Sequence, residues 1–152
     1  MEPRSSQPPP SADGGTCVFC ALLEGRGTAA WIHHGDRASA LLPLPDSSLA
    51  PGHCLVIPQA HVVGMQDAPA DVLQAVTSCA QDLARGMQTA LGAHGVNVLH
   101  ASGAAAGQSV GHLHLHVVPR WEGDGLETWP EGRSAHVAPA EWLPALRAEV
   151  AR

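Results

Sequence analysis

The most restrictive feature of this 152-residue chain is a short segment in which histidines alternate with other residues, mostly aliphatic. His112, His114 and His116 are each separated by a single leucine. Successive side chains of a β-strand point to opposite faces, so an extended backbone places the three imidazoles on one face and the leucines on the other. We therefore predict a strand over residues 111–118 whose aliphatic face packs in the core.

Three imidazoles on one half-buried face need binding partners, because burying polar groups without partners costs free energy. A single histidine on a strand is most often a polar surface group, whereas three in alternation are typical of a binding site. Two kinds of partner suit neutral imidazoles, namely a metal ion and an anion. The pattern alone does not choose between them.

A loop rich in glycine and alanine, over residues 102–107, precedes the histidines. Small residues let the backbone approach a ligand closely, and successive amide N–H groups can form an anion-binding concavity. Gln108 and Ser109 add side-chain donors at the end of this loop. A glycine-rich loop is weak evidence by itself, but beside three histidines it predicts that a phosphate group is held there.

The rest of the chain predicts a sheet of short strands with one long helix. Apolar residues recur at three- and four-residue steps over 69–91, which indicates an amphipathic helix, with Asp67 as the cap at its start and Gly92 or Gly95 at its end. We expect strands at residues 31–34, 38–42, 54–57, 96–99 and 111–118, a helical turn at 17–23 and a short helix at 142–150. Tight turns join the strands, so the predicted fold is α+β with a mostly antiparallel sheet.

Composition argues against several classes of function. The net charge is −6 and every basic residue is arginine, which argues against a nucleic-acid partner and leaves no lysine for catalysis. No segment reaches the roughly 18–20 apolar residues of a membrane span, and the start lacks a signal-peptide pattern, so we expect a cytoplasmic protein without a membrane partner. Residues 1–16 are rich in proline, serine and glycine, which predicts a disordered tail before a single domain over 17–152.

Cys17 and Cys20 form a Cys-x-x-Cys motif that is compatible with zinc, with redox chemistry or with no special role. A redox role requires a thioredoxin-like βαβ setting, which the predicted element order lacks. Zinc requires two further ligands to complete a tetrahedron. Cys54 and Cys79 lie in apolar patterns and are expected in the core.

Residues 17–125 resemble the histidine-triad superfamily, especially its bacterial members. Five segments carry the resemblance in the same order, namely CVFC (17–20), PGHCLVIPQAH (51–61), AGQS (106–109), SVGHLHLHVV (109–118) and PR (119–120). The resemblance implies a five-stranded, mostly antiparallel sheet with one long and one short helix. It also implies a homodimer with two-fold symmetry in which the two sheets join.

The resemblance further implies an enzyme acting on a nucleotide. His114 would attack the α-phosphorus and form a nucleotidyl-histidine, which water then hydrolyses. The backbone carbonyl of His112 would hold the tautomer of His114, and His116 would donate to the phosphate. His53 would order the histidines beside the nucleotide, and the alternative is a packed histidine at a strand edge. The loop would contribute phosphate contacts from Gly107, Gln108 and Ser109, the last two also assisting the leaving group.

A structural zinc site is implied as well, with Cys17, Cys20, His61 and His112 as ligands. This closed site would tie the N-terminal turn to the sheet, and the alternative is a spare thiol pair. His112 would then act twice, through its side chain on zinc and through its carbonyl on His114.

Two positions depart from the family pattern. Many members have a ribose-binding aspartate eight residues before the histidine that corresponds to His53, where this chain has Pro45 followed by Asp46. Ala101 stands where many members have a phosphate-contacting asparagine. The nucleobase stays open, as does the leaving group, which is an amine, a phosphate chain or a sulfate. Two rival hypotheses are a nucleotide-binding or interaction protein with little turnover, and a structural zinc protein whose histidines serve only as ligands.

Overall fold

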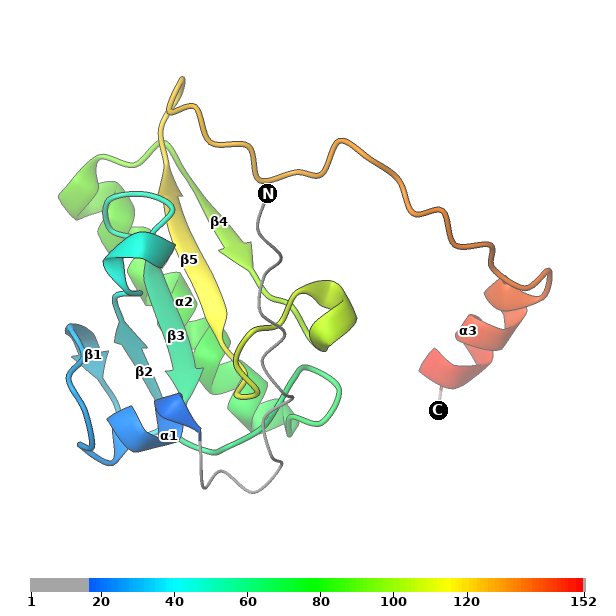
Figure 1. The fold of residues 1–152 in the computed structure, drawn as a ribbon, viewed down its shortest axis with the longest axis horizontal. Coiled ribbons are helices and arrows are strands. Elements are labelled where there is room, and N and C mark those ends of the chain that lie inside the picture. Colours follow the sequence, from blue (N-terminus) through cyan, green and yellow to red (C-terminus); the bar gives the residue numbers. More distant parts are fainter. Residues whose placement is uncertain (1–16, 152) are drawn as a thin grey trace.

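The structure is a computed structural model that describes residues 17–151, so the predicted tail lies outside the described residues. Its centre is a five-stranded sheet in the order β1-β2-β3-β5-β4, and all neighbouring strands are antiparallel (Figure 1). The strands are β1 (Trp31–His34), β2 (Ala38–Leu41), β3 (Cys54–Pro58), β4 (Gly95–Leu99) and β5 (Leu115–Arg120). The predicted α+β class and antiparallel sheet are confirmed.

Helix α2 (Ala70–Leu91) covers one face of the sheet (Figure 1). It ends at Gly92, whose φ of 62° is a left-handed conformation that glycine adopts without a steric penalty. The predicted cap at Asp67 is wrong, because the N-cap position is Pro69, which offers no side-chain acceptor. The Asp67 carboxylate instead accepts hydrogen bonds from the backbone N–H groups of Val63 and Gly64, at 2.9 and 2.7 Å, and so closes the preceding turn.

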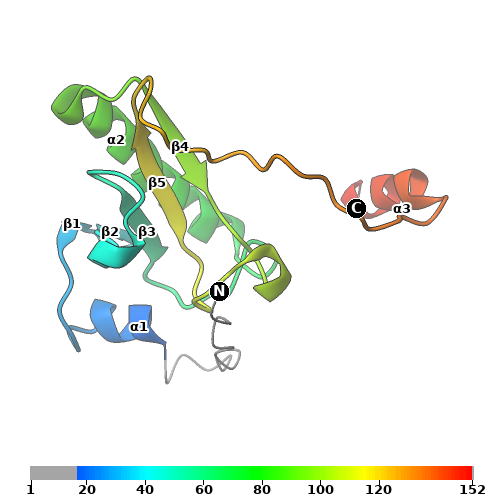
Figure 2. The ribbon, with the colours of Figure 1, turned by 45° about the horizontal axis from the view of Figure 1, so that its top comes forward.

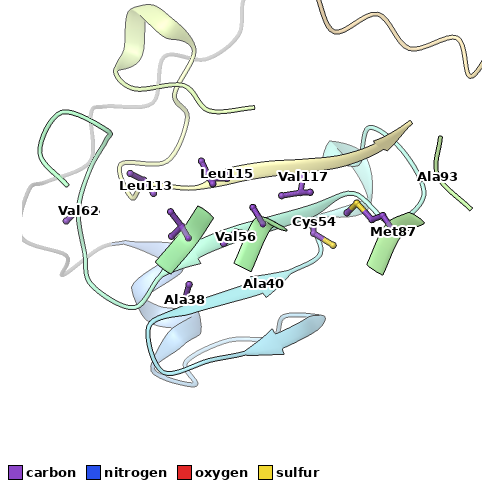
Figure 3. Close-up of a cluster of buried hydrophobic side chains, with 12 residues drawn as sticks. Ala38, Ala40, Cys54, Val56, Val62, Met87, Ala93, Leu113, Leu115 and Val117 are labelled. Atoms are coloured by element: carbon purple, nitrogen blue, oxygen red, sulfur yellow. The ribbon is translucent and has the colours of Figure 1, made fainter. Parts of the chain in front are cut away.

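The sheet is buried on both faces at its centre. Figure 3 shows the cluster between the sheet and α2, which includes Val56, Leu115 and Val117. On the other face, Leu55 and Ile57 pack with Phe19 of helix α1 (Val18–Leu23). This two-sided burial explains why β3 is apolar at every position.

The predicted strand over residues 111–118 begins later than expected, at Leu115. Only Cys54–Val56 of β3 pairs with β5, and the backbone N–H of Leu113 donates to the carbonyl of Val62 in the loop after β3, at 2.7 Å. The alternation nevertheless persists, because Leu113 is fully buried in the cluster under α2. The odd-numbered side chains therefore face α2, and the histidines face α1.

The C-terminal segment leaves the sheet after β5 and runs to helix α3 (Trp142–Val150), which lies apart from the sheet in both views (Figures 1 and 2). This helix has the predicted bounds but no buried residue. The single domain expected over residues 17–152 stays a prediction. Within the described part of the chain, no helix has the length and hydrophobicity that crossing a membrane requires.

Candidate functional site

His114 lies just before β5 and is 7% exposed, with its ring against the edge of Phe19. Its Nδ1 is 2.8 Å from the backbone oxygen of His112. A carbonyl oxygen only accepts hydrogen bonds, so Nδ1 carries the ring proton and Nε2 keeps its lone pair. Burial lowers the pKa of His114, which favours the neutral ring. The predicted orienting role of the His112 carbonyl is thus present in the geometry.

His116 belongs to a second hydrogen-bond chain whose proton positions are also fixed. The backbone N–H of Leu49 donates to Nδ1 of His53 at 3.0 Å, so the proton of His53 is on Nε2. That N–H donates to Nδ1 of His116, also at 3.0 Å. The remaining nitrogen of His116, Nε2, therefore carries a proton, and burial lowers the pKa of His116 to about 4. The half-buried His116 is a neutral hydrogen-bond donor, the form that contact with a phosphate oxygen requires.

The side chain of His112 joins a separate cluster with Cys17, Cys20 and His61, as expected from the resemblance. Nδ1 of His112 is 3.4 Å from Sγ of Cys17 and 3.5 Å from Sγ of Cys20, and Nδ1 of His61 is 3.2 Å from Sγ of Cys20. Ligands of a tetrahedral zinc ion lie about 3.3–3.8 Å apart, given its bond lengths to nitrogen and sulfur. The spacing of these four side chains therefore fits a tetrahedral metal site.

The surroundings of this cluster also suit a metal. Nε2 of His112 donates to the backbone oxygen of Pro58 at 3.0 Å, so its Nδ1 lone pair faces the sulfur atoms. Burial, and then the hydrogen bond and charge of Cys17, raise the pKa of Cys20 to about 11. A nearby cation would offset this cost of ionisation. Nε2 of His61 is buried and has no hydrogen-bond partner among the described residues.

The glycine-rich loop is held in place by Gln108. Its amide nitrogen donates to the carbonyls of Val63 and Val110, at 2.6 and 2.9 Å, and its amide oxygen accepts from the N–H of Gly103 at 2.7 Å. Ser109 is exposed, and its hydroxyl has no hydrogen bond within the part of the chain that the structure describes. The contacts of Gln108 therefore show that it braces the loop. Of the two side-chain donors predicted here, Ser109 is the one whose hydroxyl is free to bind a ligand.

His100, which belongs to none of the sequence motifs, also contacts the site. Its Nδ1 donates to the backbone oxygen of His114 at 3.0 Å, and its Nε2 accepts from the Ser102 hydroxyl at 2.6 Å. Ser102 accepts in turn from the backbone N–H of Met65 at 2.7 Å. No local motif marks His100, because its partner is a backbone atom fourteen residues further along the chain.

The departures from the family pattern lie at the rim. Asp46 is exposed in a short 3-10 helix (Pro45–Ser47), and its carboxylate has no partner among residues 17–151. Ala101 is half-buried and adds no polar side chain to the loop. The structure therefore shows a complete histidine centre with a rim that differs from the expected one.

Comparison with known proteins agrees with this geometry. A family model described as a HIT domain matches residues 28–123. The chain belongs to the histidine-triad (HIT) family. A HIT-like protein of Mycoplasma genitalium is 37% identical over 107 residues, which make up 70% of this chain and 74% of that protein. An adenylylsulfatase of Arabidopsis thaliana is 33% identical over 110 residues, or 72% of this chain and 55% of that longer protein.

Solved structures give the same assignment. The chain is similar to a zinc-bound histidine triad family protein from Mycobacterium smegmatis, with a TM-score of 0.70 and 37% identity over 74% of this chain and 80% of that one. The chain is thus a member of a nucleotide-binding superfamily that includes hydrolases, and its HIT fold carries a candidate Cys2His2 metal site.

Proposed function

We propose that this HIT protein cleaves a nucleoside 5′-monophosphate from a leaving group through a nucleotidyl intermediate on His114. The observation that carries the proposal is the tautomer of this buried ring. Its Nδ1 proton is held by the carbonyl of His112, so the lone pair of Nε2 is available without a general base.

In the first step, Nε2 of His114 attacks the α-phosphorus and forms a P–N bond. The bond from phosphorus to the leaving group breaks, and the leaving group takes its electron pair. An amine also takes a proton from the Ser109 hydroxyl, whereas a phosphate chain or a sulfate departs as an anion. The ring becomes positively charged while its Nδ1–H stays against the His112 carbonyl, whose partial negative charge favours that state. Water then attacks phosphorus, the electron pair of the P–N bond returns to Nε2, and the proton that water loses returns to Ser109 or passes to the solvent. The products are a nucleoside monophosphate and the free leaving group.

The neighbouring groups stabilise charge on the phosphate. His116 offers an N–H that His53 keeps in position, and the loop offers the hydroxyl of Ser109. The backbone N–H of Gly107, which was also expected to contact the phosphate, donates instead to the carbonyl of Ala104 at 3.0 Å. Assistance to the leaving group falls to Ser109, since Gln108 is engaged in bracing the loop. An amine, a phosphate chain or a sulfate is the expected leaving group, and the similarity to an adenylylsulfatase supports including the last.

The test compares His114→Ala with His94→Ala, a matched change at an exposed histidine. Both variants are assayed on an adenosine phosphoramidate, adenylyl sulfate and a dinucleoside polyphosphate, and the wild type is acid-quenched with labelled substrate. We expect the label to be on His114 of the wild type. We expect turnover by the wild type and by His94→Ala, and none by His114→Ala. Retained turnover by His114→Ala would refute the mechanism, and binding without turnover or label would support the rival nucleotide-binding protein.

We also propose that Cys17, Cys20, His61 and His112 hold a structural zinc ion. The fit rests on the donor set, on its tetrahedral spacing and on the hydrogen bond that presents Nδ1 of His112 to the sulfur atoms. Bound zinc would supply four bonds that join α1 to the sheet.

Cys20→Ser and Cys79→Ser form a matched pair, because only Cys20 belongs to the cluster. We expect about one zinc per chain in the wild type and in Cys79→Ser, and loss of zinc with a lower melting temperature in Cys20→Ser. Equal zinc content in the two variants would contradict the site. One zinc per chain with His114 and His116 free would speak against the rival hypothesis that all the histidines are ligands.

A further inference from the structure

The reactive histidine lies where the sheet loses its regular pairing. The last paired residues of β4 and β5 are Leu99 and His116, and the pairing of β3 with β5 ends at Leu115. Continuing the β4–β5 register would place Ala101 opposite His114, but β4 ends two residues before that point. His114 therefore lies beyond the paired strands, and its backbone needs other contacts to keep its position.

The segment of residues 112–114 is held by hydrogen bonds to its surroundings. The backbone N–H of Leu113 donates to the carbonyl of Val62 at 2.7 Å, which ties the middle of the segment to the loop after β3. His100 ties its end, because Nδ1 of this ring donates to the carbonyl of His114 at 3.0 Å. A side chain thus supplies a donor where a paired strand would supply a backbone N–H.

A second hydrogen bond fixes the proton positions of His100. The backbone N–H of Met65 donates to Oγ of Ser102 at 2.7 Å, which leaves the hydroxyl proton of Ser102 to donate to Nε2 of His100 at 2.6 Å. A neutral imidazole that accepts at Nε2 carries its proton on Nδ1, the nitrogen that faces the carbonyl of His114. We call these three groups, from Met65 to His100, the His100 relay.

The His100 relay begins in a turn that also supports the glycine-rich loop. This turn, over residues 62–67, is closed by the carboxylate of Asp67 and accepts a hydrogen bond from Gln108 at 2.6 Å through a backbone carbonyl. Gly64 lies so close to the relay that a Cβ at this position would be 2.8 Å from Oγ of Ser102. The turn is therefore a common anchor for the loop and for the backbone of the reactive histidine.

We propose that His100 is a positioning residue for the attack by His114, an inference that rests on the proposed function. The ring of His114 is held by a carbonyl of its own segment, that of His112, at 2.8 Å. This bond stays aligned only while the backbone between the two residues keeps its conformation. His100 fixes the carbonyl at the end of that backbone, so it keeps the direction in which Nε2 of His114 points at phosphorus.

The test uses two substitutions that separate the hydrogen bonds of His100. In His100→Asn, the side-chain amide nitrogen takes the place of Nδ1 and donates to the carbonyl of His114, while Ser102 loses its acceptor. In His100→Gln, the side-chain oxygen takes the place of Nε2 and accepts from Ser102, while no donor faces His114. Both variants carry a neutral amide, so the difference between them reports the bond to His114.

Steady-state kinetics with an adenosine phosphoramidate distinguish positioning from binding. We expect His100→Asn to recover most of the wild-type kcat. We expect His100→Gln to have a kcat lower by roughly 2- to 12-fold, the effect of one neutral hydrogen bond, with KM changed by less than about twofold. Equal kcat values for the two variants, or a difference confined to KM, would overturn the proposal.

Nitrogen-15 NMR of the protein without substrate tests the positioning independently of turnover. We expect the ring of His114 to be protonated at Nδ1 in the wild type and in His100→Asn, and to be a mixture of tautomers in His100→Gln. The same tautomer of His114 in both variants would overturn the proposal even if the wild type is fully active. The proposed function fails separately, when a wild type with the expected tautomer forms no labelled His114.

Discussion

Replacing His53 by asparagine separates the two hydrogen bonds that this ring makes. The asparagine side-chain oxygen takes the place of Nδ1 and still accepts from the N–H of Leu49, a bond of 3.0 Å in the native protein. No donor remains at the position of Nε2, so His116 loses the partner that keeps its proton on its own Nε2. Glutamine has the opposite effect, because its amide nitrogen takes the place of Nε2 while the acceptor for Leu49 is lost.

The expected magnitudes follow from what each bond does. Losing the aligned donor of His116 to a charged phosphate costs about 1.5–3 kcal/mol of transition-state stabilisation. Since 1.36 kcal/mol of activation free energy corresponds to a tenfold change in rate, this loss lowers kcat/KM by roughly 10- to 150-fold. Leaving the N–H of Leu49 unsatisfied costs about 1–3 kcal/mol of folding free energy instead. His53→Asn is therefore the more stable and less active variant, and His53→Gln is the less stable and more active one.

Three measurements examine this reasoning. Denaturant unfolding gives the stability of each variant, and turnover of an adenosine phosphoramidate gives kcat/KM. Nitrogen-15 NMR reports the tautomer of His116, which we expect to be protonated at Nε2 in the wild type and in His53→Gln, and mixed in His53→Asn. The reasoning is refuted if His53→Asn retains wild-type kcat/KM, or if the tautomer of His116 is the same in both variants.

Two further predictions concern pH and packing. Burial lowers the pKa of His114, and it lowers the pKa of His116 to about 4, so kcat/KM should stay level as the pH falls through 6.5. A pH–rate profile with a midpoint at 6.5 or above would contradict this. These rings bind protons more weakly when folded, so the free energy of unfolding should be fully retained above pH 6.5 and decrease from there towards pH 4, as urea titrations at several pH values would show. Leu113→Ala, at a fully buried position, should lower the free energy of unfolding by about 2–5 kcal/mol, whereas Val98→Ala, at a position 53% exposed, should stay within about 0.5 kcal/mol.

Local patterns were sufficient to predict most of the elements. The apolar stripe predicted α2 to within a residue, because side-chain periodicity directly reports which face is buried. The start of β5 was not predictable in this way, since it depends on Leu113 bonding to Val62 in a loop rather than to a neighbouring strand. Asp67 is a similar case, because an aspartate near a helix start suits a cap and a preceding turn equally well.

The residues of the site likewise divide into those that sequence patterns predicted and those that they did not. The cluster of Cys17, Cys20, His61 and His112 was expected only because the spacing of its motifs resembles a known family, and the structure brings all four together. His100 escaped notice because its partner is a backbone carbonyl, which leaves no trace in the pattern of side chains. The separation of α3 from the sheet was equally hidden, since an apolar stripe does not tell which surface will cover it.

His112 acts through its imidazole and through its backbone carbonyl, and a substitution at this position removes only the imidazole. Its imidazole faces the cysteines, and any substitution removes it. Its carbonyl holds the proton of His114, and every amino acid carries that group. A lineage that loses the cysteines can therefore let position 112 drift while the neighbouring histidine keeps its orientation, so the metal cluster and the reactive ring are free to evolve at separate rates.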